Sequence, residues 1–455
     1  MQKIQAAHAL LPDGWVRDKI IKIGEDGRIT DIEPAADRTA SAVDLLLPAP
    51  VNLHSHSFQR AMAGLTEARG GDPTDSFWTW RRLMYRFLDR LTPDHVEAIA
   101  AQAFVEMLET GFGAVAEFHY LHHGPGGLAY DNPAEMATRV AAAAEKTGIG
   151  LTLLPVLYMQ GGCDGRALEG GQRRFGCNLE PFGELLDHSA AALDPLPGDT
   201  CLGVAPHSLR AVPPDALRHI AKLREATPVH LHLAEQQAEV DEVEAHLGAR
   251  PVTWLLDTQP PDERWCLIHC TQMTSTETAD LAATGAIAGL CPITEANLGD
   301  GIFNGVEFDR AGGKFGVGSD SNVQISLWSE LAALEYSQRL RDQTRAALAR
   351  ASHSTGRALF DQVCAAGAQA AGRRSGAIAP GRWADLIAVK TDTPDLCARR
   401  DDAWLDSLIF GRHGESSVTD VWSAGRLVVR DGRHVARQSV ERAFIKTLQD
   451  LAETI

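Results

Sequence analysis

Histidine and acidic side chains follow four short apolar runs in this 455-residue sequence. They are His54 and His56 after the first run, His232 and Glu235 after the second, His269 after the third and Asp320 after the fourth. Two histidines at positions i and i+2 of an extended chain point to the same side, so they can bind one metal ion. Each pattern is weak alone, but their joint occurrence predicts a metal centre.

The predicted metal ligands are His54, His56, His232 and Asp320. Three imidazoles and one carboxylate suit zinc or another borderline divalent cation better than magnesium. We expect one divalent ion, with Zn²⁺ favoured. A second ion would need a bridging lysine carbamate at the end of the fourth strand, and no lysine stands there.

A set of this kind predicts hydrolytic chemistry. A zinc ion lowers the pKa of its bound water to about 7 and so provides hydroxide at neutral pH. Asp320 can take the proton of this water, and Glu235 can protonate the nitrogen whose bond order falls or which leaves. His269 can orient the hydroxide or stabilise a tetrahedral intermediate. These three residues are therefore predicted to be catalytic in the hydrolysis of a C–N bond, by deamination or amide cleavage.

Eight apolar runs must position these side chains. The runs are residues 49–53, 113–118, 150–157, 201–205, 228–233, 265–268, 286–290 and 315–318, and helix-like stretches include 93–110, 133–146, 214–226 and 238–247. This alternation predicts an α/β fold, a TIM-like (β/α)8 barrel over residues 49–374, with a doubly wound open sheet as the alternative. Catalytic residues of such a barrel lie at the carboxyl ends of its strands. Neither GxGxxG nor GxxxxGK[ST] occurs, so a nucleotide cradle is not supported.

Both ends of the chain differ from this α/β pattern. Residues 1–48 and 375–435 contain short β-rich runs separated by turns, and we expect them to form one small composite β-sandwich domain. Residues 436–455 are expected to form a C-terminal helix. The segment 161–176 is rich in glycine and charge, and it is either a surface loop or a lid over the barrel mouth.

Composition excludes several classes of protein. Lys and Arg number 43 against 60 Asp and Glu, a net charge of −17 that argues against nucleic-acid and anionic-membrane partners. The 8 cysteines form no CxxC pair, which argues against zinc ribbons and redox motifs. The start of the chain lacks signal-peptide features, and no apolar run approaches the roughly 20 residues of a membrane helix. We expect a cytoplasmic enzyme.

Several motifs resemble those of the amidohydrolase superfamily across nearly the whole chain. They are LPAPVNLHSH, HLHLAE, LIHC, GVGSD and the tail element GAIAPGRWADLIAV. The resemblance is to the branch of deaminases with one metal ion. It implies the ligand set given above, proton transfer by Glu235 and assistance by His269. Members of the superfamily are often dimers, so a homodimer is expected.

Further segments resemble the formimidoylglutamate deiminase family. They are residues 56–61, 77–81, 117–120, 205–210 and 291–301. This resemblance implies hydrolysis of N-formimino-L-glutamate to N-formyl-L-glutamate and ammonia, a reaction of histidine degradation. The substrate is a small dicarboxylate.

Two carboxylates need local donors on an acidic protein. Arg81 and Arg210 can supply bidentate guanidinium contacts, and Arg81 is preferred to Arg82 on the WR spacing of the family. Gln59, Tyr120 and His207 can add polar contacts to the substrate. Two alternatives stay open. One is another aminohydrolase with one metal ion, acting on guanine, an adenosine derivative or a triazine, and the other is a barrel scaffold without activity.

Overall fold

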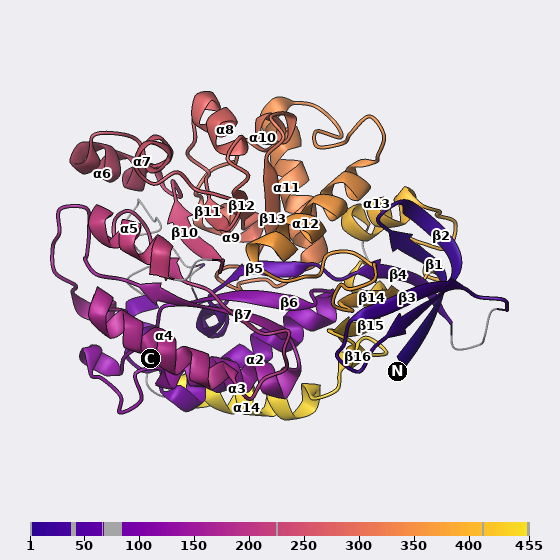
Figure 1. Ribbon diagram of the computed structural model, residues 1–455, viewed down its shortest axis with the longest axis horizontal. Coiled ribbons are helices and arrows are strands. Elements are labelled where there is room, and N and C mark those ends of the chain that lie inside the picture. The colour runs from indigo at the N-terminus through magenta and orange to yellow at the C-terminus, as the bar shows by residue number, and fades with distance from the viewer. Residues whose placement is uncertain are drawn as a thin grey trace.

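The computed structural model describes residues 2–37, 42–65, 67, 84–223, 226–411 and 414–452. Its strands group into one sheet built from both ends of the chain and a larger α/β body (Figure 1). Within the described residues, no helix has the length and apolar character needed to cross a membrane.

The α/β body contains two parallel sheets. The first has β5 (Val51–Ser55), β6 (Ala114–His119), β7 (Gly150–Leu157) and β8 (Cys201–Leu202), with β9 (Ala205–Pro206) also paired to β7. The second has β10 (Val229–Leu233), β11 (Trp265–His269), β12 (Ile287–Leu290) and β13 (Lys314–Val317). These strands fall on the eight predicted runs, with β8 and β9 both on the run 201–205. They are buried almost throughout, which explains why they are apolar without alternation.

Isolated parallel bridges join the two sheets at both of their edges. They pair Val204 with Val229, Ser208 with His232, and Ser55 with Asp320. The last bridge brings the end of the eighth run beside the end of the first. Residues that are more than 260 positions apart in the sequence therefore meet at one edge of the sheets.

Helices follow most of these strands and cover the sheets. The helices are α2 (Pro93–Thr110), α3 (Glu135–Thr147), α4 (Leu179–Leu193), α5 (Pro214–Leu223), α6 (Gln237–Leu247), α7 (Pro251–Thr258), α8 (Ser275–Ala282), α9 (Pro292–Leu298), α10 (Gly305–Arg310), α11 (Leu327–Asp342) and α12 (Thr355–Ala370). Short 3₁₀ helices are η1 (Ser57–Met62), η2 (Pro125–Gly127), η3 (Gly170–Arg174) and η4 (Glu415–Ser417). The four predicted helices are all present. The Thr92 side chain caps α2 by accepting from the His95 N–H, and Gly111, with φ of 110°, ends it.

The two ends of the chain form one eight-stranded sheet. Its order is β17 (Arg433–His434), β16 (Arg426–Arg430), β15 (Val418–Ser423), β14 (Leu386–Val389), β4 (Val43–Pro48), β1 (Gln2–Leu11), β2 (Gly14–Ile23) and β3 (Ile29–Pro34). In β4, Leu46 pairs with Ala9 of β1 and with Ala388 of β14. The prediction that both ends contribute strands to one β-unit is thus seen in the register.

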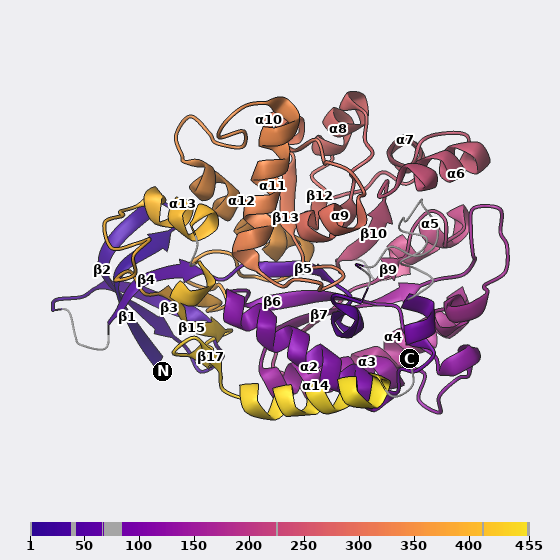
Figure 2. The ribbon, with the colours of Figure 1, turned by 180° about the vertical axis from the view of Figure 1, so that it is seen from behind.

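A buried ionic network connects this sheet to the α/β body. Arg373 binds Asp199 and Asp385, each at 2.7 Å, and Arg426 binds Asp199 at 2.8 Å. The side chains of Arg373, Asp199 and Asp385 are at most 2% exposed. Helix α13 (Asp402–Phe410) packs on α11 and α12, and α14 (Arg437–Ala452) lies along α2 (Figure 2).

Candidate metal centre and active site

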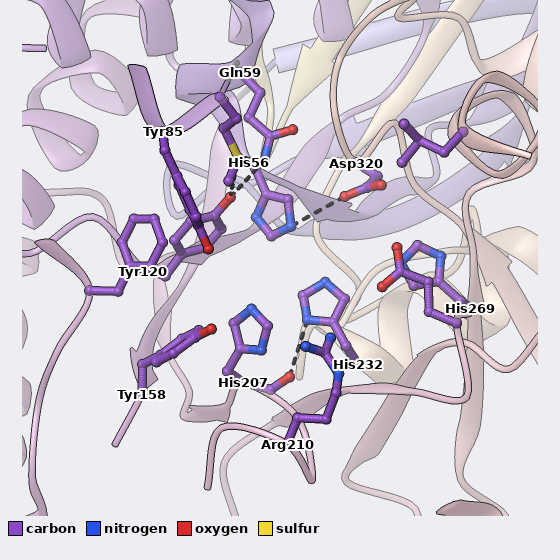
Figure 3. Close-up of a pocket in the computed structure, with 14 residues that line it drawn as sticks. His56, Gln59, Tyr85, Tyr120, Tyr158, His207, Arg210, His232, His269 and Asp320 are labelled. Carbon is purple, nitrogen blue, oxygen red and sulfur yellow. Dashed lines mark hydrogen bonds and ion pairs between the residues drawn. The ribbon is translucent and has the colours of Figure 1, made fainter. Parts of the chain in front are cut away.

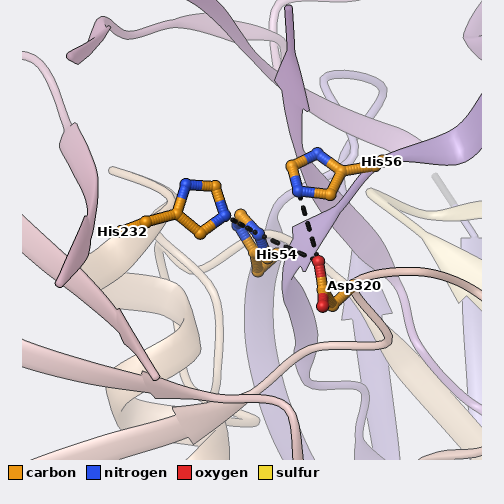
Figure 4. Close-up of side chains that lie close together, drawn as sticks. All are labelled: His54, His56, His232 and Asp320. Carbon is orange, nitrogen blue, oxygen red and sulfur yellow. Dashed lines mark hydrogen bonds and ion pairs between the residues drawn. The ribbon is translucent and has the colours of Figure 1, made fainter. Parts of the chain in front are cut away.

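Four predicted ligands meet at the joined ends of the parallel strands. Donor atoms of His54, His56, His232 and Asp320 lie within 4.8 Å of one another, and all four side chains are buried (Figure 4). The Nε2 atoms of His54 and His56 are 3.3 and 3.2 Å from Oδ1 of Asp320. Nε2 of His232 is 3.1 Å from Nε2 of His54.

The backbone fixes which nitrogen faces the centre in two of the three rings, those of His56 and His232. Nδ1 of His56 is 3.0 Å from the Phe118 carbonyl, and Nδ1 of His232 is 3.1 Å from the His207 carbonyl. A carbonyl only accepts, so both Nδ1 atoms carry the proton and both Nε2 lone pairs point inward. The sequence pattern gave no sign of these two carbonyl contacts.

The charge state of the centre suits a cation. Burial lowers the pKa of His54, His56 and His232, so these rings are neutral at pH 7. Inward lone pairs and a carboxylate repel one another unless a positive charge lies between them. The four residues therefore fit a divalent metal ion.

The loop after β13 holds Asp320 by its backbone. The Asp320 N–H donates to the His54 carbonyl, and the His56 N–H donates to the Asp320 carbonyl, both at 2.9 Å. Asp320 has a φ of 43°, a left-handed conformation that such paired hydrogen bonds stabilise. The predicted ligand that follows β13 is thus tied directly to the two predicted ligands at the end of β5.

His269 lies beside this centre between two carboxylates. Its Nε2 is 3.6 Å from Glu235 and its Nδ1 is 3.3 Å from Glu295. Burial alone would lower the pKa of His269, but Glu235, Glu295 and Asp320 raise it to about 10. Burial raises the pKa of Glu235. Glu235 and the cationic His269 are placed to hold and move protons next to the predicted ligands.

Most predicted substrate-binding residues line the same pocket as the metal centre. Gln59, Tyr120, His207 and Arg210 surround it together with Glu235, His269 and Asp320 (Figure 3). The space between these side chains, counted together with the open solvent at its mouth, is about 570 Å³. Gln59 Nε2 donates to the Tyr120 hydroxyl at 2.6 Å. Arg81 and Arg82 lie outside the described residues.

Arg210 provides a buried cation in this pocket. The residue is 6% exposed, and its Nε finds no hydrogen-bond partner within the described part of the chain. Burial would lower its pKa, but Glu239, Tyr158 and Glu235 raise it, so the guanidinium stays charged. A buried cation with an unused donor can bind an anionic group of a ligand.

Sequence reasoning missed other residues of the site. Tyr85, Tyr158 and Phe175 add aromatic walls to the pocket. Tyr158 directly follows β7, and this strand-end position could have revealed it. Glu295, which binds His269, lies in the segment 291–301, but its spacing gave no indication of that contact.

The segment 161–176 packs against the pocket. Arg174 is fully buried, and it donates to the carbonyls of Leu88, Leu91 and His123. Phe175, next to it, lines the pocket. The segment therefore forms part of the wall, and whether it moves stays a prediction.

Other histidines have structural partners. Nε2 of His230 donates to the Ala370 carbonyl at 2.8 Å, and the buried ring is part of the core. His122 and His123 lie at hydrogen-bond distance from the carbonyls of Val156 and Gly176. These contacts hold both rings in the loop that follows β6.

Comparisons with known proteins place the chain in a family. Residues 45–428 match the model described as "Amidohydrolase family", and residues 1–44 match the "Formimidoylglutamate deiminase HutF, N-terminal domain". The chain belongs to the amidohydrolase family, which is metal-dependent.

One relative and two solved structures match this chain over nearly its whole length. The chain is 47% identical over 460 residues to the formimidoylglutamate deiminase of Pseudomonas aeruginosa, covering 100% of both chains. A crystal structure of an amidohydrolase from Brucella melitensis is 48% identical, with a TM-score of 0.95 over 99% of this chain and 100% of that one. An adenosine deaminase from Xanthomonas campestris with bound zinc is 20% identical, with a TM-score of 0.79 and coverage of 99% and 98%. This last likeness concerns the fold alone.

Proposed function

We propose that this protein hydrolyses N-formimino-L-glutamate to N-formyl-L-glutamate and ammonia. The observation that carries the proposal is the pocket itself, where buried Arg210 shares one space with the metal centre and with Glu235. The substrate has the matching parts, carboxylates at one end and a C–N bond to be cleaved at the other. The 47% identical relative bears the name of this activity.

We propose zinc as the metal, held by His54, His56, His232 and Asp320. Zinc at this site would supply hydroxide at neutral pH by lowering the pKa of a water molecule. Glu235, with its raised pKa, donates a proton to the departing nitrogen. His269, kept cationic by its contact with the Glu295 carboxylate, stabilises the negative charge that develops on oxygen in the tetrahedral intermediate.

Arg210 is proposed to bind a substrate carboxylate, with Arg81 as the predicted partner for the other one. Gln59, Tyr120 and His207 supply further polar groups around the substrate. The same pocket also has three tyrosines and a phenylalanine, which suit a planar heterocycle. Neutral guanine and adenosine carry no anionic group that could pair with the buried guanidinium, and this favours the dicarboxylate.

We further infer that the two parallel sheets form one closed (β/α)8 barrel. Supporting this, parallel bridges connect their edges at both seams. We propose the domain limits 49–374 for the barrel, 1–48 with 375–435 for the β-domain and 436–455 for the C-terminal helix. The homodimer and the cytoplasmic location stay predictions, and eight free cysteines accord with a reducing compartment.

The direct test is ammonia release by zinc-loaded protein. N-formimino-L-glutamate, guanine and adenosine are offered in parallel, and N-formyl-L-glutamate is identified as the co-product. Chelator-treated protein, with and without added zinc, serves as the control. We expect turnover of formiminoglutamate alone, lost with the metal and restored by zinc. Turnover of a heterocycle but not of formiminoglutamate would refute the proposed substrate and leave the hydrolase reading in place.

A further inference from the structure

The turn that carries Glu235 is held by hydrogen bonds from behind the pocket. The Glu235 N–H donates to Oε2 of Glu239 at 3.0 Å, and Thr271 Oγ1 donates to the Glu235 carbonyl at 2.5 Å. The Gln272 N–H donates to the carbonyl of Ala234, whose φ is 51°. These hydrogen bonds hold the backbone at residues 234 and 235, whereas the next residue, Gln236, is held through its side chain.

Asp300 completes this support from a different loop. The Gln236 side-chain amide donates to Oδ1 of Asp300, and the Gln272 amide donates to its carbonyl. The Asp300 N–H donates to the carbonyl of Glu295 at 2.9 Å. Asp300 thus joins the residue next to Glu235 to the residue that binds His269.

The local sequence turns this side chain inward. Gly299 and Gly301 flank Asp300 with φ of 73° and 132°, conformations that glycine adopts without strain. The Asp300 side chain is buried, with the residue 4% exposed, and it does not line the pocket. It therefore acts on the site only through its neighbours.

Burying the carboxyl group of Asp300 costs free energy, so its presence at this position calls for a functional explanation. Burial raises the pKa of Asp300 to about 9, with Glu235 raising it and His269 opposing. An apolar side chain could fill the same space without this penalty. The acceptor for Gln236 is the feature that an apolar residue could not supply.

We propose that Asp300 is a positioning residue, which acts through Gln236 to hold Glu235 in the orientation for proton transfer. This inference rests on the proposed function, because it assigns Glu235 the role of proton donor. In this proposal, Gln236 and Asp300 contribute to catalysis through the single hydrogen bond that joins their side chains. Replacing either partner should therefore slow the chemical step more than it weakens substrate binding.

The test compares four variants of the full-length, zinc-loaded enzyme. They are Asp300→Ala, Asp300→Asn, Gln236→Ala and the double variant Asp300→Ala/Gln236→Ala. The neighbouring Gln237→Ala, which removes an exposed amide bonded to Asp241, is the matched control. The measurements are kcat, KM and metal content per chain.

We expect Asp300→Ala and Gln236→Ala each to lower kcat by roughly 10- to 100-fold, with KM and metal content near wild type. Asp300→Asn keeps an acceptor oxygen and should restore most of kcat. The double variant should be no worse than the poorer single variant, because both substitutions break the same contact.

Wild-type kcat in Asp300→Ala, or losses that multiply in the double variant, would overturn the inference. Failure of Asp300→Asn to restore kcat would also overturn it, since the acid itself would then be needed. If Asp300→Ala does not fold, Gln236→Ala and Asp300→Asn still decide. A wild-type enzyme without formiminoglutamate activity would instead count against the proposed function, which separates the two failures.

Discussion

Replacement of Arg210 by glutamine tests the proposed substrate contact most directly. The guanidinium is buried in the pocket and offers an unused Nε donor. Loss of a bidentate, charge-assisted contact to a carboxylate should cost about 2–4 kcal/mol of transition-state binding, or roughly 30- to 900-fold in kcat/KM. Arg210→Lys keeps the charge without the planar fork and should lie in between.

The assay is steady-state ammonia release, with metal content measured on the same samples. Arg218→Gln on α5, an exposed arginine paired with Asp215, is the matched control. Two shortened substrates each lack one carboxylate, N-formimino-4-aminobutyrate and N-formimino-2-aminobutyrate. The effect of Arg210→Gln should disappear on one of them, because that substrate has no carboxylate to lose. The reasoning is refuted if Arg210→Gln retains wild-type kcat/KM, or if its loss is equal on all three substrates.

Three further outcomes are expected. Glu235→Gln should lower kcat by roughly 10²- to 10⁴-fold while metal content stays normal, as measured by ammonia release and metal analysis. Arg373→Met leaves the buried Asp385 without its cationic partner, and should reduce the free energy of unfolding by about 3–5 kcal/mol in urea titrations followed by circular dichroism. Burial lowers the pKa of His122 from 6.5 to about 4, so the unfolded chain binds a proton more readily. Its contribution to stability is present above pH 6.5 and is lost as pH falls towards 4. His122→Gln, which can still donate to the Val156 carbonyl, should therefore lose about 2–3 kcal/mol less than wild type between pH 7.5 and 4.5. Equal losses in the two proteins would contradict this reading.

The cluster of His54, His56, His232 and Asp320 was predictable because its members follow local patterns. His54 and His56 are two apart at a strand end, and His232 and Asp320 also follow apolar runs. The carboxyl ends of parallel strands share one edge, so four local signals combine into one site. The strands themselves were predictable because burial on both faces leaves them almost wholly apolar.

The support around these residues was not predictable in the same way. The contacts of Glu295 with His269 and of Asp300 with Gln236 join separate loops, and no spacing within either segment encodes them. Tyr158 looks like any aromatic residue of a core until its position beside the pocket is known. Such tertiary contacts depend on how the whole chain closes.

The pairing of the two chain ends has a consequence during protein synthesis. Strand β4 cannot complete its pairing until β14 has been synthesised, because Leu46 pairs with Ala388. Almost the entire α/β body lies between these two residues in the sequence. At translation rates of about 5–20 residues per second, the first strands wait roughly 20–70 s for this partner. During that time Ile4, Ile21 and Leu46, which are buried in the finished sheet, lack their final cover. Until β14 is synthesised, the strands β1, β2 and β4 of the nascent chain therefore expose apolar side chains, and surface of this kind is prone to aggregate.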